Sequence, residues 1–250
     1  MDVEMEKQLR LDKYLADMGV GTRTEVKQLI KKGLVIVNQT VIKRPETKVT
    51  QTDEVIVQGT KISYVPYQYF MLHKPAGVVS ATQDRIHKTV MDCMEHSIGM
   101  KRDDYFPVGR LDIDTEGLLL ITNDGELAHN LLSPRKHVQK TYYATIDGVV
   151  TEKEILQFAQ GLDLQEFIAK PAKLVVLSST DTTSEVEVTI YEGKFHQVKR
   201  MFEAVGMKVR YLKRLSMGSL VLDKTLAVGA VRQLTEEEIE LLKKDHDNVK

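Results

Sequence analysis

The sequence predicts an α+β protein with two domains, and three observations support this. The 250 residues suffice for one mid-sized domain and a small one. Hydrophobic residues make up 42% of the chain, so an apolar core can form. Helical and strand-like patterns follow one another without the regular βαβ alternation of parallel sheets. We expect a small domain in residues 1–60, a linker in 61–68, and a larger domain in 69–250 on a mostly antiparallel sheet.

The small domain is expected to contain two helices followed by a small sheet. Apolar residues at helical spacing predict a first helix over residues 8–17. Thr22 and Glu25 have the spacing of a capping box, which predicts a second helix that ends at Gly33. Short apolar runs then predict strands at 34–37, 41–42 and 54–57.

The larger domain shows strands and helices in mixed order. The polar segment 80–106 has poor periodicity, and it predicts no element. Apolar runs predict strands at 70–72, 118–121, 142–146 and 185–191. Helical patterns cover 126–132, 195–205 and a final helix capped by Thr235 and Glu238.

Composition excludes several classes of protein. No apolar run approaches the ~20 residues of a membrane helix, and the acidic N-terminus does not resemble a secretory signal. Cys93 is the single cysteine, so no intramolecular disulfide can form. We expect a monomeric cytoplasmic protein that makes no membrane contact. The sequence lacks the glycine-rich nucleotide motifs, metal-ligand spacing and G-x-S-x-G elbow, so neither a cofactor nor a metal is expected.

Charge is distributed unevenly along a chain whose net charge is −1. Residues 192–214 contain seven lysines and arginines against two glutamates, whereas glutamates cluster at 236–240. Such runs are most often solvated helix faces, but the basic run also fits a nucleic-acid contact.

The segment from Pro107 to Leu118 reads P-V-G-R-L-D-I-D-T-E-G-L and precedes a predicted buried strand. Residue types alone do not separate a catalytic aspartate from a turn aspartate here. Asp112 and Asp114 are both candidates.

The N-terminal segment resembles the RNA-binding domain named from ribosomal small-subunit protein S-four. The resemblance rests on R-L-D-K-Y-L from Arg10 and T-R-T-E-V-K-Q-L-I-K-K-G-L-V-I-V-N from Thr22. It implies that the second helix and the turn after it present basic groups to RNA. The counterparts in this sequence are Arg23, Lys27 and Lys31, followed by Lys32, Lys43 and Arg44.

The larger domain resembles pseudouridine synthases of the RsuA/RluB type. Four motifs agree in order and spacing: H-K-P-A-G from His73, G-R-L-D-I-D-T-E-G-L-L-L-I-T-N-D-G from Gly109, K-T-Y from Lys140, and E-G-K-F-H-Q-V-K-R-M-F-E-A-V-G from Glu192. The resemblance implies an RNA-modifying isomerase that works without a cofactor and acts on a uridine flipped out of its stack.

The resemblance also implies roles for single residues. Asp112 is expected to be the nucleophile, and Lys199 is expected to be the cation that keeps its carboxylate charged, with Arg200 as the adjacent alternative. Tyr142 matches the aromatic residue that stacks on the flipped base. RNA or base contacts are implied for Arg110, Leu212, Lys140, Lys194, His196 and Arg200, of which His196 fits a structural hydrogen bond equally well.

The motifs K-T-Y and K-F-H-Q-V-K-R-M look closer to the small-subunit branch of that family. We therefore expect pseudouridine formation in small-subunit ribosomal RNA or an assembly particle. Large-subunit ribosomal RNA and a non-catalytic assembly factor remain the alternatives.

Overall fold

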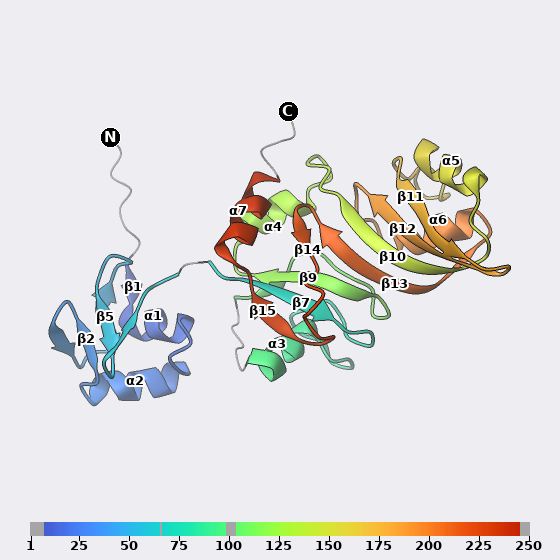
Figure 1. Cartoon of the computed structure of the whole chain (residues 1–250). Helices are drawn as coiled ribbons and strands as arrows, with labels where there is room; N and C mark the ends of the chain where they lie inside the picture. The colour runs from blue at the N-terminus through green and yellow to red at the C-terminus, as the bar shows by residue number, and fades with distance from the viewer. Residues whose placement is uncertain (1–7, 66, 99–103, 246–250) are drawn as a thin grey trace, which may run out of the picture. The chain divides into compact units, whose positions relative to one another are not determined.

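The computed structural model describes residues 8–65, 67–98 and 104–245 (Figure 1). The chain divides into two compact units, Met1–Tyr67 and Gln68–Lys250.

The first unit packs two helices against short antiparallel strands. Helices α1 (Leu11–Asp17) and α2 (Arg23–Lys31) bury Leu11, Tyr14, Leu15, Val26 and Ile30. The four-stranded sheet has the order β3-β2-β5-β6, and β1 pairs separately with β4. The strands are β1 (Leu9–Arg10), β2 (Val35–Val37), β3 (Thr40–Ile42), β4 (Lys48–Val49), β5 (Val55–Val57) and β6 (Thr60–Ile62).

Two boundaries in the first unit differ from the expectation. The first helix begins at Leu11 because Leu9 and Arg10 pair with Val49 and Lys48 as a strand. The expected linker 61–68 begins inside β6, which pairs with β5. The capping box is present, with Thr22 accepting from the Glu25 backbone N–H and the Glu25 side chain accepting from that of Thr22.

The second unit is built on one nine-stranded sheet. Its main path has the order β11-β12-β10-β13-β9-β7-β15, while β8 pairs with β9 and β14 with β13. Among the strand pairs of the described residues, only β9 and β13 run parallel, so the mostly antiparallel sheet was predicted correctly. The strands are β7 (Tyr69–Lys74), β8 (Phe106–Pro107), β9 (Glu116–Thr122), β10 (Lys140–Asp147), β11 (Lys173–Ser179), β12 (Thr183–Ile190), β13 (Lys208–Met217), β14 (Leu220–Val221) and β15 (Val231–Gln233).

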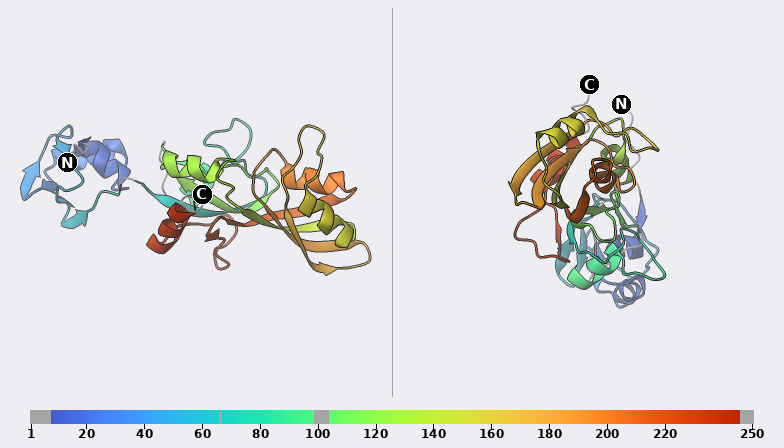
Figure 2. Two further views of the ribbon diagram at one scale, coloured as in Figure 1. Left: turned by 90° about the horizontal axis from the view of Figure 1, so that it is seen from above. Right: turned by 90° about the vertical axis from the view of Figure 1, so that its right-hand side faces the viewer.

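Helices cover both faces of this sheet (Figure 2). Alternate residues of β7 and β9 enter two hydrophobic clusters, as the period of two in a strand requires. Helices α3 (Val90–Ile98), α5 (Glu152–Gln160) and α6 (Gln197–Ala204) pack on the first cluster. Helices α4 (Gly125–Leu132) and α7 (Glu236–Lys244) pack on the second.

Several features of the second unit were not predicted, among them strands β11, β13, β14 and β15. Segment 80–106 contains α3 and the first residue of β8. Helix α5 begins with a capping box of Thr151 and Glu154, a signal that the sequence does contain. Helix α6 begins at Gln197 rather than at residue 195 because His196 adopts a left-handed conformation, with φ of 50°.

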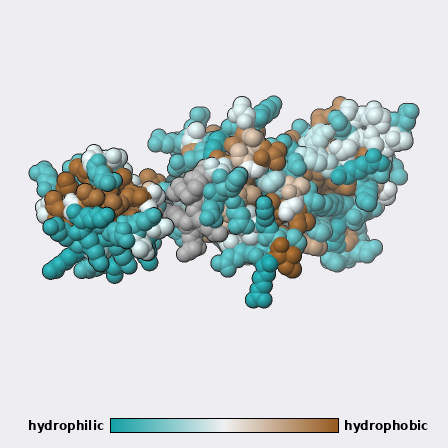
Figure 3. Space-filling model, turned by 90° about the horizontal axis from the view of Figure 1, so that it is seen from below, coloured by the Kyte–Doolittle hydropathy of each residue, from teal (hydrophilic) through white to brown (hydrophobic). Residues whose placement is uncertain are grey.

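On the face shown in Figure 3, hydrophilic residues cover most of the surface and apolar residues form smaller patches. Within the described residues, no helix combines the length and the apolar character needed to cross a membrane.

Candidate active site

The Gly109–Thr115 loop lies between β8 and β9 and carries Asp112. Strand β7 ends beside it with Lys74, which is fully buried. The Lys74 ammonium donates hydrogen bonds to the backbone oxygens of Asp112 and Thr115 at 3.1 and 2.9 Å, and to that of Pro75 at 3.0 Å. Burial lowers the pKa of Lys74 to about 8, whereas the carbonyl oxygens around its ammonium favour the charged form. Lys74 thus ties the loop to the sheet.

Three further hydrogen bonds fix the start and middle of this loop. The Ser80 hydroxyl donates to the Leu111 carbonyl at 2.9 Å and accepts from the Leu111 N–H at 3.0 Å. The Gly77 N–H donates to the Ile113 carbonyl at 2.7 Å. The H-K-P-A-G turn and the residues after it therefore hold the loop on which Asp112 lies.

The parallel junction of β9 and β13 depends on Gly117. Gly117 has φ of 107°, and a Cβ atom there would overlap the backbone of Arg214. Because the strands approach this closely, Leu212 and Arg214 of β13 lie beside the loop. Strand β10 pairs with β13 so that Tyr142 is opposite Arg214.

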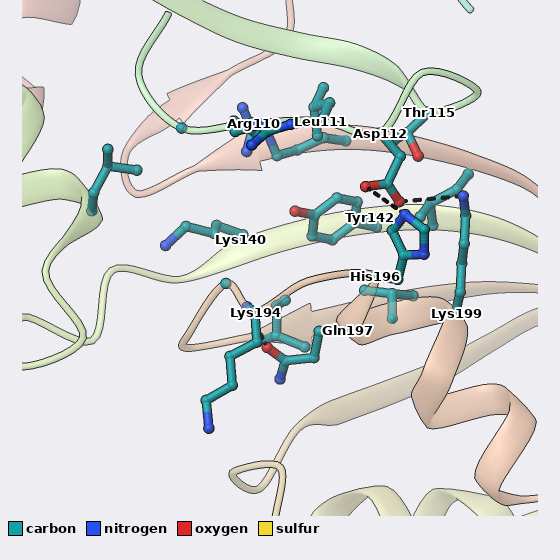
Figure 4. A pocket seen from close by; sticks show the side chains of 17 residues that line it. Arg110, Leu111, Asp112, Thr115, Lys140, Tyr142, Lys194, His196, Gln197 and Lys199 are labelled. Carbon is teal, nitrogen blue, oxygen red and sulfur yellow. Dashed lines mark hydrogen bonds and ion pairs between the residues drawn. The ribbon is translucent and has the colours of Figure 1, made fainter. Parts of the chain in front are cut away.

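One pocket in the second unit joins these elements (Figure 4). It is open to solvent, and its lining comes from the loop, the sheet strands and the start of α6. The site residues predicted from the sequence that line it are Arg110, Asp112, Lys140, Tyr142, Lys194, His196, Lys199 and Leu212.

Asp112 carries the carboxylate of this pocket, and its side chain is 25% exposed. Its Oδ2 lies 3.2 Å from the Lys199 ammonium, and its Oδ1 lies 3.5 Å from Nε2 of His196 (Figure 4). The phenyl ring of Tyr142, buried in the sheet, lies between Asp112 and Lys140 (Figure 4). A carboxylate, a cation and an aromatic ring thus converge from three separate motifs.

Lys199 bridges two carboxylates. Its ammonium lies 2.6 Å from Asp114, whose side chain is 66% exposed, as well as 3.2 Å from Asp112. Burial acts to lower the pKa of Lys199, but the hydrogen bond to Asp114 and the charge of Asp112 raise it above the ordinary value. Burial acts to raise the pKa of Asp114, but the hydrogen bond and the charge of Lys199 lower it below the ordinary value. Both groups are therefore charged at neutral pH.

His196 combines a strained backbone with a contact to Asp112. A left-handed conformation is uncommon for residues other than glycine, and such strain often occurs at functional sites. The imidazole also stacks on the Phe195 ring, with 3.7 Å between the ring centroids. Phe195 is 73% exposed, so its ring is free on its outer side.

Not all predicted residues meet at the pocket. Arg200, the alternative cation for Asp112, instead contacts Glu166 at 3.0 Å and the Leu164 carbonyl at 2.9 Å. Lys194 does line the pocket, and its ammonium lies 3.7 Å from the centroid of the Phe167 ring. Arg23, Lys27 and Lys31 lie in the first unit, where they share one exposed face of α2.

Sequence reasoning assigned no role to Lys74, Ser80 or Arg214. The sequence signal for Lys74 is its place at the end of the apolar run Y-F-M-L-H-K. A lysine buried there needs hydrogen-bond acceptors, which indicates a structural contact. No local pattern indicates Ser80. Arg214 was one member of a basic run, and only the strand register places it in the pocket. Within the described part of the chain, no three histidine, cysteine or acidic side chains are grouped as a metal site.

Comparison with known proteins shows the family of the chain. Residues 68–204 match the RNA pseudouridylate synthase family, and residues 9–55 match the S4 domain. The chain belongs to the RNA pseudouridine synthase family. An uncharacterized RNA pseudouridine synthase of Bacillus subtilis is 45% identical over 94% of this chain and 98% of its own length.

Two relatives with named substrates are almost equally similar to this RNA pseudouridine synthase. The ribosomal large subunit pseudouridine synthase B of B. subtilis is 40% identical over 94% of this chain and 95% of its own length. The ribosomal small subunit pseudouridine synthase A of Vibrio cholerae is 41% identical over 92% of this chain and 98% of its own length. A crystal structure of a pseudouridylate synthase, 37% identical, matches with a TM-score of 0.65 over 94% of this chain and 99% of its own.

Proposed function

We propose that this pseudouridine synthase acts on a uridine of ribosomal RNA, with Asp112 as the nucleophile. The observation that carries the proposal is the position of the Asp112 carboxylate, 3.2 Å from the Lys199 ammonium at the edge of the Tyr142 ring. A carboxylate attacks as the anion, and the Lys199 ammonium is the cation that faces it in the pocket.

The reaction rearranges bonds without a change in oxidation state. The bond from ribose C1′ to uracil N1 breaks, the detached base turns, and C1′ bonds to C5. The proton of C5 is lost and N1 regains one, so atoms and electrons balance. Asp112 forms a transient bond to ribose C1′ or to the uracil ring, and this bond breaks again before the product leaves.

Access to the uridine requires that it leave its stack, at a cost of a few kcal/mol. Tyr142 offers a ring face inside the pocket, and stacking of a base on an aromatic ring recovers about 1–3 kcal/mol. Leu212 and Arg110 line the same pocket, where Leu212 would supply an apolar wall and Arg110 would contact the RNA strand.

Small-subunit ribosomal RNA is the proposed substrate. The motifs K-T-Y at Lys140 and K-F-H-Q-V-K-R-M at Lys194 favour that branch, and the Vibrio cholerae relative acts on the small subunit by name. Large-subunit ribosomal RNA is the second candidate because the B. subtilis large-subunit relative is equally similar.

Carbodiimide labelling followed by primer extension on unmodified transcripts of both ribosomal RNAs tests this assignment. We expect one new stop in the small-subunit transcript or its assembly particle. A stop only in large-subunit RNA would show that large-subunit RNA, and not small-subunit RNA, is the substrate. Absence of a stop on both RNAs and on assembly particles, with RNA binding retained, would indicate a non-catalytic assembly factor.

A further inference from the structure

The pocket holds more positive charge than its ion pairs neutralise. Five lysine and arginine side chains line it, whereas Asp112 is its single carboxylate. Asp112 contacts Lys199 and His196 at one side of the Tyr142 ring. Lys140 lies at the other side of that ring (Figure 4).

Lys140 and Arg214 are buried cations without an acidic partner. They are 6% and 2% exposed, respectively. The Lys140 ammonium donates to the Val138 carbonyl at 2.8 Å, and Nε of Arg214 donates to the Leu118 carbonyl at 2.8 Å. Neither side chain takes part in an ion pair within the described residues. Nη2 of Arg214 has no hydrogen-bond partner there, and neither does the buried hydroxyl of Thr115, which lines the same pocket.

Glu192 is a buried acid next to the lining residue Gly193, but it does not neutralise Lys140 and Arg214. Glu192 does not line the pocket, and its Oε1 accepts from the Lys170 N–H and the Gln197 amide, both at 2.9 Å. Burial and the charge of Arg214 lower the pKa of Lys140 to about 8. Buried like charges are unfavourable unless an anion compensates them.

We propose that Lys140 and Arg214 form a subsite for one phosphate group of the RNA strand, across the Tyr142 ring from Asp112. A phosphate carries a full negative charge, and guanidinium and ammonium groups are its usual partners. An uncharged uracil carbonyl accepts hydrogen bonds but leaves both cations uncompensated. The proposal rests on the proposed function in taking RNA as the ligand.

A phosphate at this subsite favours the protonated form of Lys140. Because the pKa of Lys140 is about 8 in the free protein, RNA binding then takes up a proton, and affinity falls as pH rises from 7 to 9. The other charged and titratable groups lining the pocket around Lys140 are Arg110, Asp112, Tyr142, Lys194, His196, Lys199 and Arg214.

The test measures binding of a short oligouridylate to the full chain carrying Asp112→Asn, which removes turnover. Lys140→Met is compared with Lys208→Met, an exposed lysine at the start of β13. We expect Lys140→Met to weaken binding about tenfold and the control to have little effect. The slope of log affinity against log salt should decrease by about 0.7, the value for one phosphate contact on a single strand.

Two further measurements separate this role from a structural one. Lys140→Met removes a buried unpaired charge, and this gain offsets the loss of the hydrogen bond to the Val138 carbonyl, so the stability of the free protein at pH 7 should change little. Lys140→Arg should retain the salt slope and lose the pH dependence, since arginine does not titrate in this range.

An unchanged salt slope in Lys140→Met would overturn the phosphate subsite, whether the protein is destabilised or not. Slower turnover of the Lys140→Met protein with intact Asp112, at unchanged affinity and salt slope, would place the contact on the reacting base and overturn it too. Since binding is measured without turnover, the result remains interpretable even where no pseudouridine forms on ribosomal RNA.

Discussion

At the scale of single residues, the site depends on how Lys199 divides its charge between two carboxylates. Asp112 is the more enclosed of the two, with its side chain 25% exposed against 66% for Asp114. Asp114 makes the shorter contact to Lys199, at 2.6 Å, but its carboxylate is mostly solvated. The enclosed partner faces the Tyr142 ring and the pocket, which favours Asp112 over Asp114 as the reactive group.

We expect Lys199→Met to lower the rate of pseudouridine formation by roughly 10²-fold, because the Asp112 carboxylate then lacks its ammonium neighbour. Single-turnover kinetics on the RNA identified by mapping measures this effect. Lys208→Met is the control for loss of a lysine on the same domain. A Lys199→Met protein with the rate of the intact chain would contradict the assigned role.

The sequence predicted most of these residues through four motifs, and the structure brings eight of the predicted site residues into one pocket. Arg200 shows the limit of motif reasoning, because a helix turns adjacent residues to different sides. Lys199 faces Asp112, whereas Arg200 faces Glu166. Arg214 was missed because its role depends on the pairing of β13 with β9 and β10, which is a long-range property.

At the scale of elements, β7 and the loop before β9 act as one unit through Lys74. Removal of its ammonium leaves buried carbonyl oxygens without a donor, at about 1–3 kcal/mol. We expect Lys74→Met to lower the free energy of unfolding by that amount and to slow turnover, since the Asp112 loop loses its anchor. Denaturant unfolding and the rate together measure this, with exposed Lys224→Met as the control.

An unaltered rate in a destabilised Lys74→Met protein would show that the loop keeps its geometry without this lysine. Unaltered stability would contradict the anchoring contact itself.

The β9–β13 junction gives a second prediction at this scale. Gly117→Ala introduces a side chain where backbone atoms of Arg214 lie and where φ is positive, so we expect a loss of more than about 3 kcal/mol. Gly125→Ala, at the start of α4, meets no atom within 4 Å and should change stability by less than about 0.5 kcal/mol. Equal stability of the two variants, measured by thermal unfolding, would contradict the close approach.

Local sequence signals predicted which helices and strands exist better than they predicted the residues at which these begin and end. The capping boxes at Thr22 and Thr235 mark the starts of α2 and α7 as expected. Residues 9–10 fit a helical pattern but form a strand, because a partner at 48–49 competes for their backbone groups. Helix α3 lies in a segment of poor periodicity, where packing against the sheet decides the outcome.

At the scale of the whole molecule, net charge is a poor guide to RNA binding. The chain has a net charge of −1, yet its pocket is lined by five lysine and arginine residues and one carboxylate. Local charge, rather than the total, determines where a polyanion is held.

We propose the basic face of α2 as a second place for RNA contact. We expect the combined change Arg23→Gln, Lys27→Gln and Lys31→Gln to weaken RNA binding and reduce its salt dependence, with little change in the rate at saturating RNA. Lys48→Gln with Lys61→Gln, two exposed lysines on strands of the same unit, is the control. An equal effect of both sets on affinity would show that α2 has no special role.

Parallel single-turnover assays of Asp112→Asn and Asp114→Asn distinguish the two candidate catalytic carboxylates. We predict that Asp112→Asn lowers pseudouridine formation by at least about 10⁴-fold with fold and RNA binding retained. Asp114→Asn should stay within about threefold of the intact chain. Loss of activity in Asp114→Asn with activity retained in Asp112→Asn would contradict the account and move the nucleophile to Asp114.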